Sequence, residues 1–219
     1  MRLFLASNVL GNYPDKLVEL VGENRKVLVI SNARDHRTPE DRKVIVKHDM
    51  DIIRTCGLEP LELDLKNYIG KSDELRAYID TFAPGCIFVM GGNYYSLATT
   101  FKLSGMDKIL LSDLAEDKYV YAGYSAGAMV TAPDLMNYFS SYGSRDGNRM
   151  EEARAIYGEV YTDGLGVVDF YVLPHIDEEK FRESYEKAAS ELSGKDLKTA
   201  ALKNSDVILI QDKNTTFLS

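Results

Sequence analysis

The sequence predicts an α/β protein in three layers, with a mainly parallel sheet between helices on both faces. Short apolar runs rich in β-branched residues recur along the chain, and segments with helix signals separate them. The runs at 26–31 and 86–90 have continuous apolar centres, which is typical of strands buried on both faces. Because such strands are joined through helices, we expect right-handed crossovers. We expect the whole chain, residues 1–219, to fold as one domain.

Residues that start and stop helices set the expected boundaries in the first half of the chain. Pro14 and Pro39 suit the first turn of a helix, and Thr38 can cap the second of these helices. Gly22 and Gly57 are suited to end the same two helices. The expected elements are strands at 2–8, 26–31, 61–65 and 86–90, and helices at 14–22, 38–56, 72–84, 94–104 and 106–116.

The second half of the chain has a weaker periodic pattern. A strand is expected at 119–122, and the turn-rich segment 138–148 is expected to be a long surface loop. Its position in the chain suggests a lid, although the sequence does not decide whether the loop closes over a site. Further along, we expect a strand at 165–173, a helix at 177–192, a last core strand at 207–210 and an edge hairpin from Gln211.

Composition and charge restrict the classes of partner. A hydrophobic content of 45% and a charged content of 27% are those of a soluble globular protein. The net charge of −8 argues against nucleic acid or an anionic membrane surface as the main partner. No apolar stretch is long enough to span a membrane, and the N-terminal apolar run is too short for a signal peptide. We therefore expect a cytoplasmic protein.

Cysteine usage and known motifs argue against a metal or an organic cofactor. Cys56 and Cys86 lie in apolar surroundings without metal-ligand spacing, and we expect them to be buried free thiols in a reducing compartment. The sequence has no H-E-x-x-H, C-x-x-C or P-loop pattern. We expect no cofactor and no metal site.

The stretch Gly123-Tyr124-Ser125-Ala126-Gly127 follows a predicted strand and precedes a run of small residues. This G-x-S-x-G pattern is typical of a nucleophile elbow, a sharp strand-to-helix turn that exposes a serine hydroxyl. It predicts Ser125 as a nucleophile and the amide of Ala126 as a donor to a developing oxyanion. The alternative is an ordinary tight turn with a surface serine.

A second glycine-rich turn, Gly91-Gly92-Asn93, follows the strand expected at 86–90. Ligands of parallel sheets bind beyond the carboxyl ends of the strands, so this turn and Ser125 are expected to face one crevice. Backbone amides of the turn could complete an oxyanion hole. Alternatively, Asn93 caps the following helix, and both interpretations can hold together.

A serine nucleophile needs a general base, and the chain has three histidines. His175 follows a predicted strand and a proline, which is a suitable position for a catalytic base. His48 falls within a predicted helix and is expected to be structural. His36 lies in a charged loop and is expected to be solvated, although a loop near the strand ends could also bring it to the site. For the orienting carboxylate we choose Asp206, just before the last core strand, with Asp134 and Asp177 as alternatives.

Four pieces of the sequence together resemble the peptidase E (aspartyl dipeptidase) family of serine peptidases, which is related to the class I glutamine amidotransferase-like superfamily. The resemblance implies a flavodoxin-like, glutamine amidotransferase-like fold and a peptidase without a cofactor. It implies Ser125 as nucleophile, His175 as base, and Gly92 with Ala126 as oxyanion hole. The matching pieces are Gly91-Gly92-Asn93 with Leu97, Gly123-Tyr-Ser-Ala-Gly-Ala128, Leu173-Pro-His175, and Asp206-Val-Ile.

The same resemblance leaves the third catalytic residue open. An acid in the loop after the elbow would be Asp134 or Asp146, whereas an acid before the last core strand would be Asp206, which we prefer. We expect Asn93 and Tyr124 to contact the substrate.

The expected substrate is a short peptide, with a preference for an N-terminal aspartate implied by the resemblance. Arg145 and Arg149 are candidates to bind that side chain. We expect a monomer or a homodimer. The alternatives are a cyanophycinase-like enzyme, another serine amidase or esterase, and a non-catalytic protein that binds a small ligand in the crevice.

Overall fold

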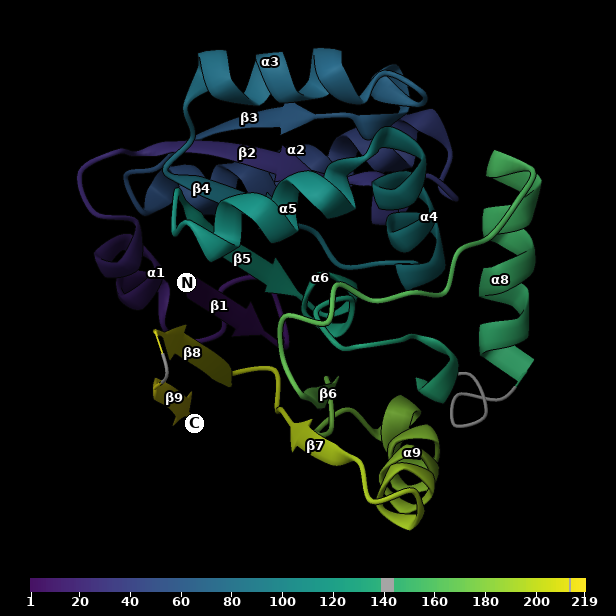
Figure 1. The fold of residues 1–219 in the computed structure, drawn as a ribbon. Coiled ribbons are helices and arrows are strands. Elements are labelled where there is room, and N and C mark those ends of the chain that lie inside the picture. The colour runs from purple at the N-terminus through teal and green to yellow at the C-terminus, as the bar shows by residue number, and fades with distance from the viewer. Residues whose placement is uncertain (139–143, 213) are drawn as a thin grey trace.

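The computed structural model describes residues 1–138, 144–212 and 214–219, with the backbone alone at 144–147. Within these residues, seven strands form one sheet in the order β3-β2-β4-β5-β1-β8-β9 (Figure 1). The five strands from β3 to β1 are parallel, whereas β8 runs antiparallel to β1 and β9 antiparallel to β8. The strands are β1 (Arg2–Ala6), β2 (Lys26–Ile30), β3 (Glu59–Leu63), β4 (Cys86–Val89), β5 (Val120–Tyr124), β8 (Val207–Gln211) and β9 (Asn214–Leu218).

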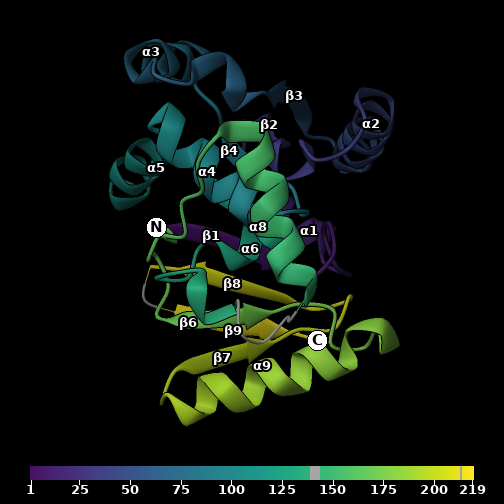
Figure 2. The ribbon, with the colours of Figure 1, turned by 90° about the vertical axis from the view of Figure 1, so that its right-hand side faces the viewer.

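Helices cover both faces of this sheet, with α3 and α5 on one side and α1 and α2 on the other (Figure 2). Side chains alternate along the strands, so Phe4 packs in the core that contains Leu17 and Ile53, while Leu3 packs in the core that contains Leu97. The helices are α1 (Pro14–Val21), α2 (Pro39–Thr55), α3 (Ser72–Phe82), α4 (Tyr94–Ser104), α5 (Met106–Ala115) and α6 (Ala126–Met129), with short 3₁₀ turns η1 (Asn32–Arg34) and η2 (Leu65–Tyr68).

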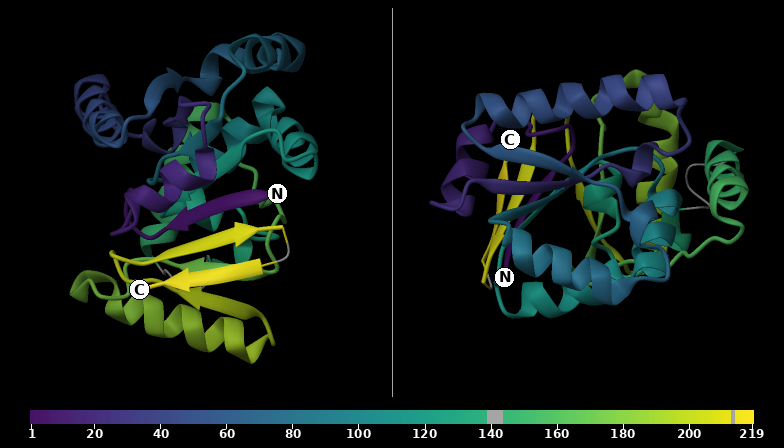
Figure 3. Two further views of the ribbon diagram at one scale, coloured as in Figure 1. Left: turned by 90° about the vertical axis from the view of Figure 1, so that its left-hand side faces the viewer. Right: turned by 90° about the horizontal axis from the view of Figure 1, so that it is seen from above.

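The predicted fold class, a three-layer α/β protein with a mainly parallel sheet, is confirmed. In the first half of the chain the expected elements form within about two residues of their predicted ends. Pro39 opens α2, and the Thr38 hydroxyl accepts a hydrogen bond from the Asp41 amide at 3.2 Å. The expected tail hairpin is also present: β8 pairs with β1, and β9 pairs antiparallel with β8 at the edge of the sheet (Figure 3).

The second half differs from the predicted elements in several places. Residues 144–148, expected to be loop, belong to the helix α8 (Ser144–Tyr157). The apolar residues of this helix are sparse and give almost no periodic signal. Among its described side chains, Ala153 is the one that is fully buried. Residues 139–143 of the expected loop and lid lie outside the described part. The strand expected at 165–173 is limited to β6 (Phe170–Leu173), which pairs with the unpredicted β7 (Lys198–Ala201) in a separate sheet.

The shortening of β6 has a local cause. Leu165 and Val168 are buried as their apolar character predicts, but their amides donate to Val130 O and Thr131 O beyond the end of α6. The segment therefore packs over the residues that follow α6 without forming a ladder. The helix expected at 177–192 forms as the turn η3 (Glu179–Phe181) followed by α9 (Arg182–Gly194).

Both cysteines are free thiols, as expected. Cys86 is buried as predicted, whereas Cys56 is only half-buried. In the residues described, none of the helices is both long enough and apolar enough to cross a bilayer.

Candidate active site

Ser125 occupies the single position between the end of β5 and the start of α6. Its backbone has φ 49° and ψ −112°, a strained conformation for a residue with a side chain. The Ser125 amide donates to Ala6 O at 3.0 Å, which ties the turn to the end of β1. Gly91 leaves room for the serine side chain, since a Cβ at position 91 would lie 2.9 Å from the Ser125 Cβ. The turn presents the serine at the carboxyl edge of the sheet.

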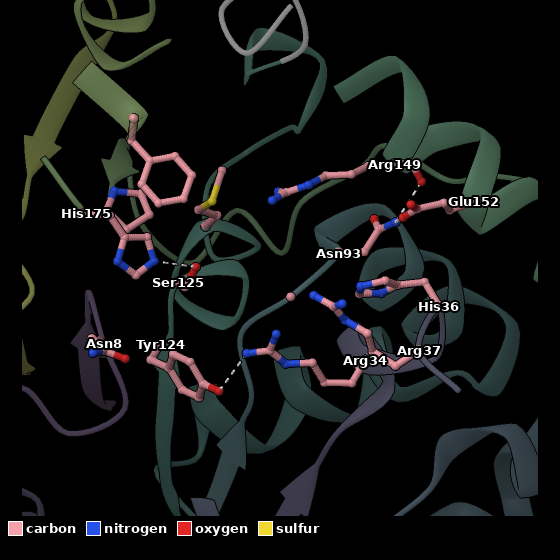
Figure 4. A pocket seen from close by; sticks show the side chains of 14 residues that line it. Asn8, Arg34, His36, Arg37, Asn93, Tyr124, Ser125, Arg149, Glu152 and His175 are labelled. Carbon is pink, nitrogen blue, oxygen red and sulfur yellow. Dashed lines mark hydrogen bonds between the residues drawn. The ribbon is translucent and has the colours of Figure 1, made fainter. Parts of the chain in front are cut away.

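His175 faces Ser125 across this edge, with Nε2 3.1 Å from the serine Oγ (Figure 4). The histidine follows β6 and Pro174, and its backbone has φ 63°. Its amide donates to Ser7 Oγ at 2.8 Å, and its ring stacks on Phe181 with centroids 5.4 Å apart. The structure thus brings the predicted nucleophile and the predicted base within hydrogen-bonding distance.

The expectation that Asp206 orients His175 needs correction. One carboxylate oxygen of Asp206 accepts from the Lys203 amide and the other from the Ser205 hydroxyl, both at 2.8 Å, so the side chain stabilises its own turn. The partner of His175 Nδ1 is Asn204 Oδ1 at 2.6 Å. The group that contacts Nδ1 is thus a side-chain amide and not the carboxylate that a serine–histidine pair predicts, and Asn204 lies two residues before Asp206.

Two of the other candidate acids, Asp134 and Asp177, have partners other than the imidazole of His175, and the side chain of the third lies outside the described part. Asp134 accepts from the Tyr171 hydroxyl at 2.7 Å and from Asn137. Asp177 accepts from the Asn204 amide at 2.9 Å and so supports the residue that contacts His175. Asp146 belongs to the stretch described by its backbone alone.

The predicted oxyanion donors are the backbone amides of Gly92, which lines the pocket with Ser125, and of Ala126, the next residue in the chain. Neither the Gly92 N–H nor the Ala126 N–H donates to an acceptor in the described part of the chain. Gly92 has φ 148°, and a Cβ there would lie 2.2 Å from Ala33 O, so this turn requires glycine. In the described part of the chain, the predicted pair Gly92 and Ala126 therefore has backbone N–H groups without an acceptor.

The two residues expected to contact substrate have their polar groups engaged by the protein. The Asn93 side chain accepts from two amides of α4, as the capping interpretation predicted, and its Nδ2 donates to Arg149 O at 2.7 Å and Glu152 Oε2 at 3.2 Å. The Tyr124 hydroxyl donates to Asp49 at 2.5 Å and accepts from Arg34 at 3.2 Å. Both side chains line the pocket, but they position other residues.

A pocket of about 200 Å³ lies in front of Ser125 and His175. Figure 4 shows Arg34, Arg37, His36 and Arg149 reaching into it from the side opposite the serine. Burial is the largest effect on His36 and lowers the pKa of its imidazole. The charge of Glu152 opposes this effect, and the nearby arginines act in the same direction as burial. His36, expected to be solvated, thus lines the pocket, whereas His48 is exposed on α2 beside Asp49.

The arginines of this pocket stand out in a chain with a net charge of −8. Arg34 Nε is buried and has no hydrogen-bond partner among the described residues. The Arg149 guanidinium lies 5.8 Å from the centre of the Tyr94 ring. Of the two arginines expected to bind an acidic side chain, Arg149 lines the pocket and the side chain of Arg145 lies outside the described part.

Sequence reasoning missed Arg34 and Arg37, although a signal was present. They lie in the polar loop that follows β2, and residues beyond the carboxyl ends of parallel strands face the ligand crevice. Within the described residues, no group of three His, Cys, Asp or Glu side chains is arranged to hold a metal ion.

A strained serine beside a histidine, at the carboxyl edge of a parallel sheet, is the arrangement found in α/β serine hydrolases. Within this class, the chain belongs to peptidase family S51, whose family model matches residues 5–218. The predicted family relationship is therefore confirmed.

Three relatives with similar sequences carry the name 'uncharacterized peptidase'. One from Listeria monocytogenes is 32% identical over 127 residues, covering 58% of this chain and 57% of the relative. One from Listeria innocua is 34% identical over 127 residues, covering 58% and 56%. The matched region is thus a little more than half the length of these two relatives. A Pasteurella multocida peptidase is 27% identical over 217 residues, covering 97% of this chain and 94% of the relative.

Two solved structures share the fold. A Listeria monocytogenes protein proposed to be a peptidase E superposes with a TM-score of 0.76 at 23% identity, covering 99% of this chain and 97% of that one. A peptidase from an acI-B1 actinobacterium gives a TM-score of 0.68 at 18% identity, covering 99% and 86%. These matches support the α/β architecture along nearly the whole chain.

Proposed function

We propose that this chain is a serine exopeptidase that hydrolyses short peptides with an acidic N-terminal residue, through an acyl-enzyme on Ser125. The observation that carries the proposal is the 3.1 Å contact between Ser125 Oγ and His175 Nε2 at a strained strand-to-helix turn. This turn has the position and the backbone strain of a nucleophile elbow. Membership of peptidase family S51 supports the same reaction class.

In the proposed mechanism, His175 Nε2 takes the hydroxyl proton while Ser125 Oγ attacks the scissile carbonyl. The amides of Gly92 and Ala126 donate to the oxyanion of the tetrahedral intermediate. His175 then passes its proton to the leaving amine, which breaks the C–N bond and leaves the acyl-enzyme. Water, deprotonated by the same histidine, releases the acid product and restores the serine.

The charges of the pocket favour an acidic substrate. Arg34, Arg37 and Arg149 offer guanidinium groups that bind carboxylates with two parallel hydrogen bonds. Among the described lining residues Glu152 is the one carboxylate, and it can bind the α-ammonium group of an N-terminal residue. A volume of about 200 Å³ suits one amino-acid residue beside the scissile bond and favours a dipeptide or a short peptide over a folded protein. We also propose a cytoplasmic location, in keeping with two free thiols.

The proposal is tested with a panel of X-Leu dipeptides, including Asp-Leu, Glu-Leu, Asn-Leu and Ala-Leu, incubated with the wild type and with Ser125→Ala. Selective hydrolysis of Asp-Leu that disappears in the variant supports both the nucleophile and the specificity. Hydrolysis of another dipeptide, also lost in the variant, keeps the mechanism and removes the acidic preference.

The alternatives are tested on the same protein with a β-linked aspartyl polymer and with simple esters. Faster turnover of either than of every dipeptide, again dependent on Ser125, would replace the peptidase by a cyanophycinase-like enzyme or an esterase. Turnover of none of these substrates would favour a non-catalytic binding protein.

A further inference from the structure

The side-chain amide of Asn204 lies between the imidazole of His175 and the carboxylate of Glu178. Asn204 Oδ1 is 2.6 Å from His175 Nδ1, and Asn204 Nδ2 donates to Glu178 Oε1 at 3.0 Å. The same carboxylate oxygen lies 3.5 Å from His175 Nδ1, which is long for a hydrogen bond but close for a charge interaction. Glu178 is therefore the carboxylate nearest to the candidate base by the contacts of the described residues.

The chemistry of these three groups sets the direction of every hydrogen bond. A carboxylate only accepts, so the NH₂ of Asn204 must face Glu178 and its oxygen must face His175. The amide oxygen also only accepts, so the proton of the neutral imidazole must be on Nδ1. Nε2 is then unprotonated and can accept from the Ser125 hydroxyl, 3.1 Å away.

We propose that Glu178 is a positioning residue that fixes the tautomer of His175 by orienting the amide of Asn204. The inference rests on the proposed function, because a serine nucleophile needs the tautomer whose Nε2 is free. Asn204 takes the place in which a directly bound carboxylate was expected. Glu178 supplies the missing negative charge one residue further out, where it also stabilises the imidazolium formed when Ser125 loses its proton.

The charged groups around this unit keep Glu178 ionised. A hydrogen bond from Lys180, with a further one from Asn204, holds the pKa of Glu178 below its usual range. Asp177 adds a second negative charge and accepts a hydrogen bond from the backbone N–H of Asn204 at 2.9 Å. Asp206 lies in the turn that contains Asn204. The pocket in front of His175 also contains the titratable side chain of His36, and the cations that line it are Arg34, Arg37 and Arg149.

The test compares Glu178→Gln with Glu179→Gln, a matched control one residue away whose side chain is 77% exposed and pairs with Arg182. Tautomers are read from ¹⁵N NMR of the imidazoles, which is practical because the chain has three histidines. His175→Asn identifies the signals of His175. The same proteins give kcat and the pH profile of kcat/KM on the best dipeptide.

Glu178→Gln is expected to populate a second His175 tautomer and to lower kcat about ten-fold with little change in KM. It is also expected to move the acidic limb of the pH profile of kcat/KM to lower pH, because a negative charge near the imidazole is lost. Asn204→Asp is expected to keep the Nδ1–H tautomer and move that limb to higher pH. Glu179→Gln is expected to match the wild type in all three measurements.

The proposal is overturned if the imidazole spectrum and the acidic limb of Glu178→Gln match those of Glu179→Gln. The NMR readout does not depend on turnover, so it separates this inference from the proposed function. A tautomer that depends on Glu178 in a protein that cleaves no peptide would support the positioning role and reject the peptidase.

Discussion

Ser7 Oγ accepts a hydrogen bond from the backbone amide of His175 at 2.8 Å. The preceding residue, Ala6, accepts a hydrogen bond from the backbone amide of Ser125 through its carbonyl at 3.0 Å. Two successive residues at the end of β1 therefore hold the candidate base and the candidate nucleophile. Both of the residues held have positive φ, and both are fixed by a hydrogen bond to this strand end. The geometry of the pair depends on β1 as much as on the two loops that carry the side chains.

Ser7→Ala is therefore expected to affect catalysis without touching a reacting atom. Loss of the buried hydroxyl leaves the His175 amide without an acceptor, which costs about 1–3 kcal/mol of stability. A displaced imidazole is expected to lower kcat about ten-fold while KM changes little. Steady-state kinetics and urea denaturation measure the two effects.

Ser104→Ala provides the control for this change, because Ser104 is also fully buried but bonds to carbonyls of its own helix α4. It is expected to leave kcat unchanged. Equal kcat in Ser7→Ala and the wild type would show that the hydroxyl of Ser7 does not hold His175 in place.

Much of the parallel core was predictable, because buried parallel strands are marked by local signals. The runs that became β2 and β4 are short, apolar and bounded by helix caps, and each forms within about one residue of its predicted ends. The helix α8 was missed since it is polar and has little apolar periodicity. Its place is set by contacts far away in sequence, such as the Tyr157 hydroxyl on Asp35 at 2.5 Å.

The site was predictable in part for the same reason. The turn at Ser125 and the strand end before His175 have local patterns, and the structure brings these side chains together. The choice of Asp206 over Asn204 depended on which side chain of one turn points to the imidazole, which is a property of the tertiary packing. The pocket arginines likewise belong to loops that meet only in the folded chain.

Arg149→Ala is expected to reduce the preference for acidic substrates. If Arg149 pairs with the substrate carboxylate, its loss removes a charge-assisted hydrogen bond worth about 1.5–3 kcal/mol, so kcat/KM for Asp-Leu falls by about 10-fold to 100-fold. The value for Asn-Leu, which carries no charge, is expected to fall less. The ratio of the two values of kcat/KM is the measurement.

Arg154→Ala is the matched control, because Arg154 lies on the same helix but is half exposed and pairs with Glu151. This variant is expected to keep the wild-type ratio. An equal loss on Asp-Leu and Asn-Leu in Arg149→Ala would assign Arg149 to general packing of the pocket and not to recognition of the charge.

Ser125→Gly is expected to be more stable than Ser125→Ala, although both lack the nucleophile. Glycine adopts φ 49° and ψ −112° without the steric cost that a Cβ imposes, which is about 1–3 kcal/mol. Part of this gain is offset by the larger entropy of glycine in the unfolded chain, so a net difference of about 1 kcal/mol remains. Urea denaturation of the two inactive variants tests this directly, and equal midpoints would show that the turn is not strained.

Asp113 is expected to make stability depend on pH through an ion pair between α3 and α5, in which the carboxylate is buried and the cations are partly exposed. Its carboxylate is fully buried and accepts from Arg76 at 2.7 Å and from Lys118 at 2.9 Å. Burial alone would raise the pKa of Asp113, but these hydrogen bonds outweigh it and hold the pKa below its usual range. The carboxylate therefore contributes stability that is fully present above the unfolded pKa of about 3.9 and is lost as pH falls through the lower folded value.

Asp113→Asn is consequently expected to cost about 2 kcal/mol at pH 7, and the difference from the wild type is expected to shrink below pH ~4. Urea denaturation of both proteins at several pH values between 7 and 3 gives this difference. Asp51→Asn serves as the control, since Asp51 also pairs with Lys47 and Arg54 but is exposed, where solvent screens the pair. It is expected to change stability little at any pH. A difference for Asp113→Asn that stays constant down to pH 3 would mean that the carboxyl is not held ionised by Arg76 and Lys118.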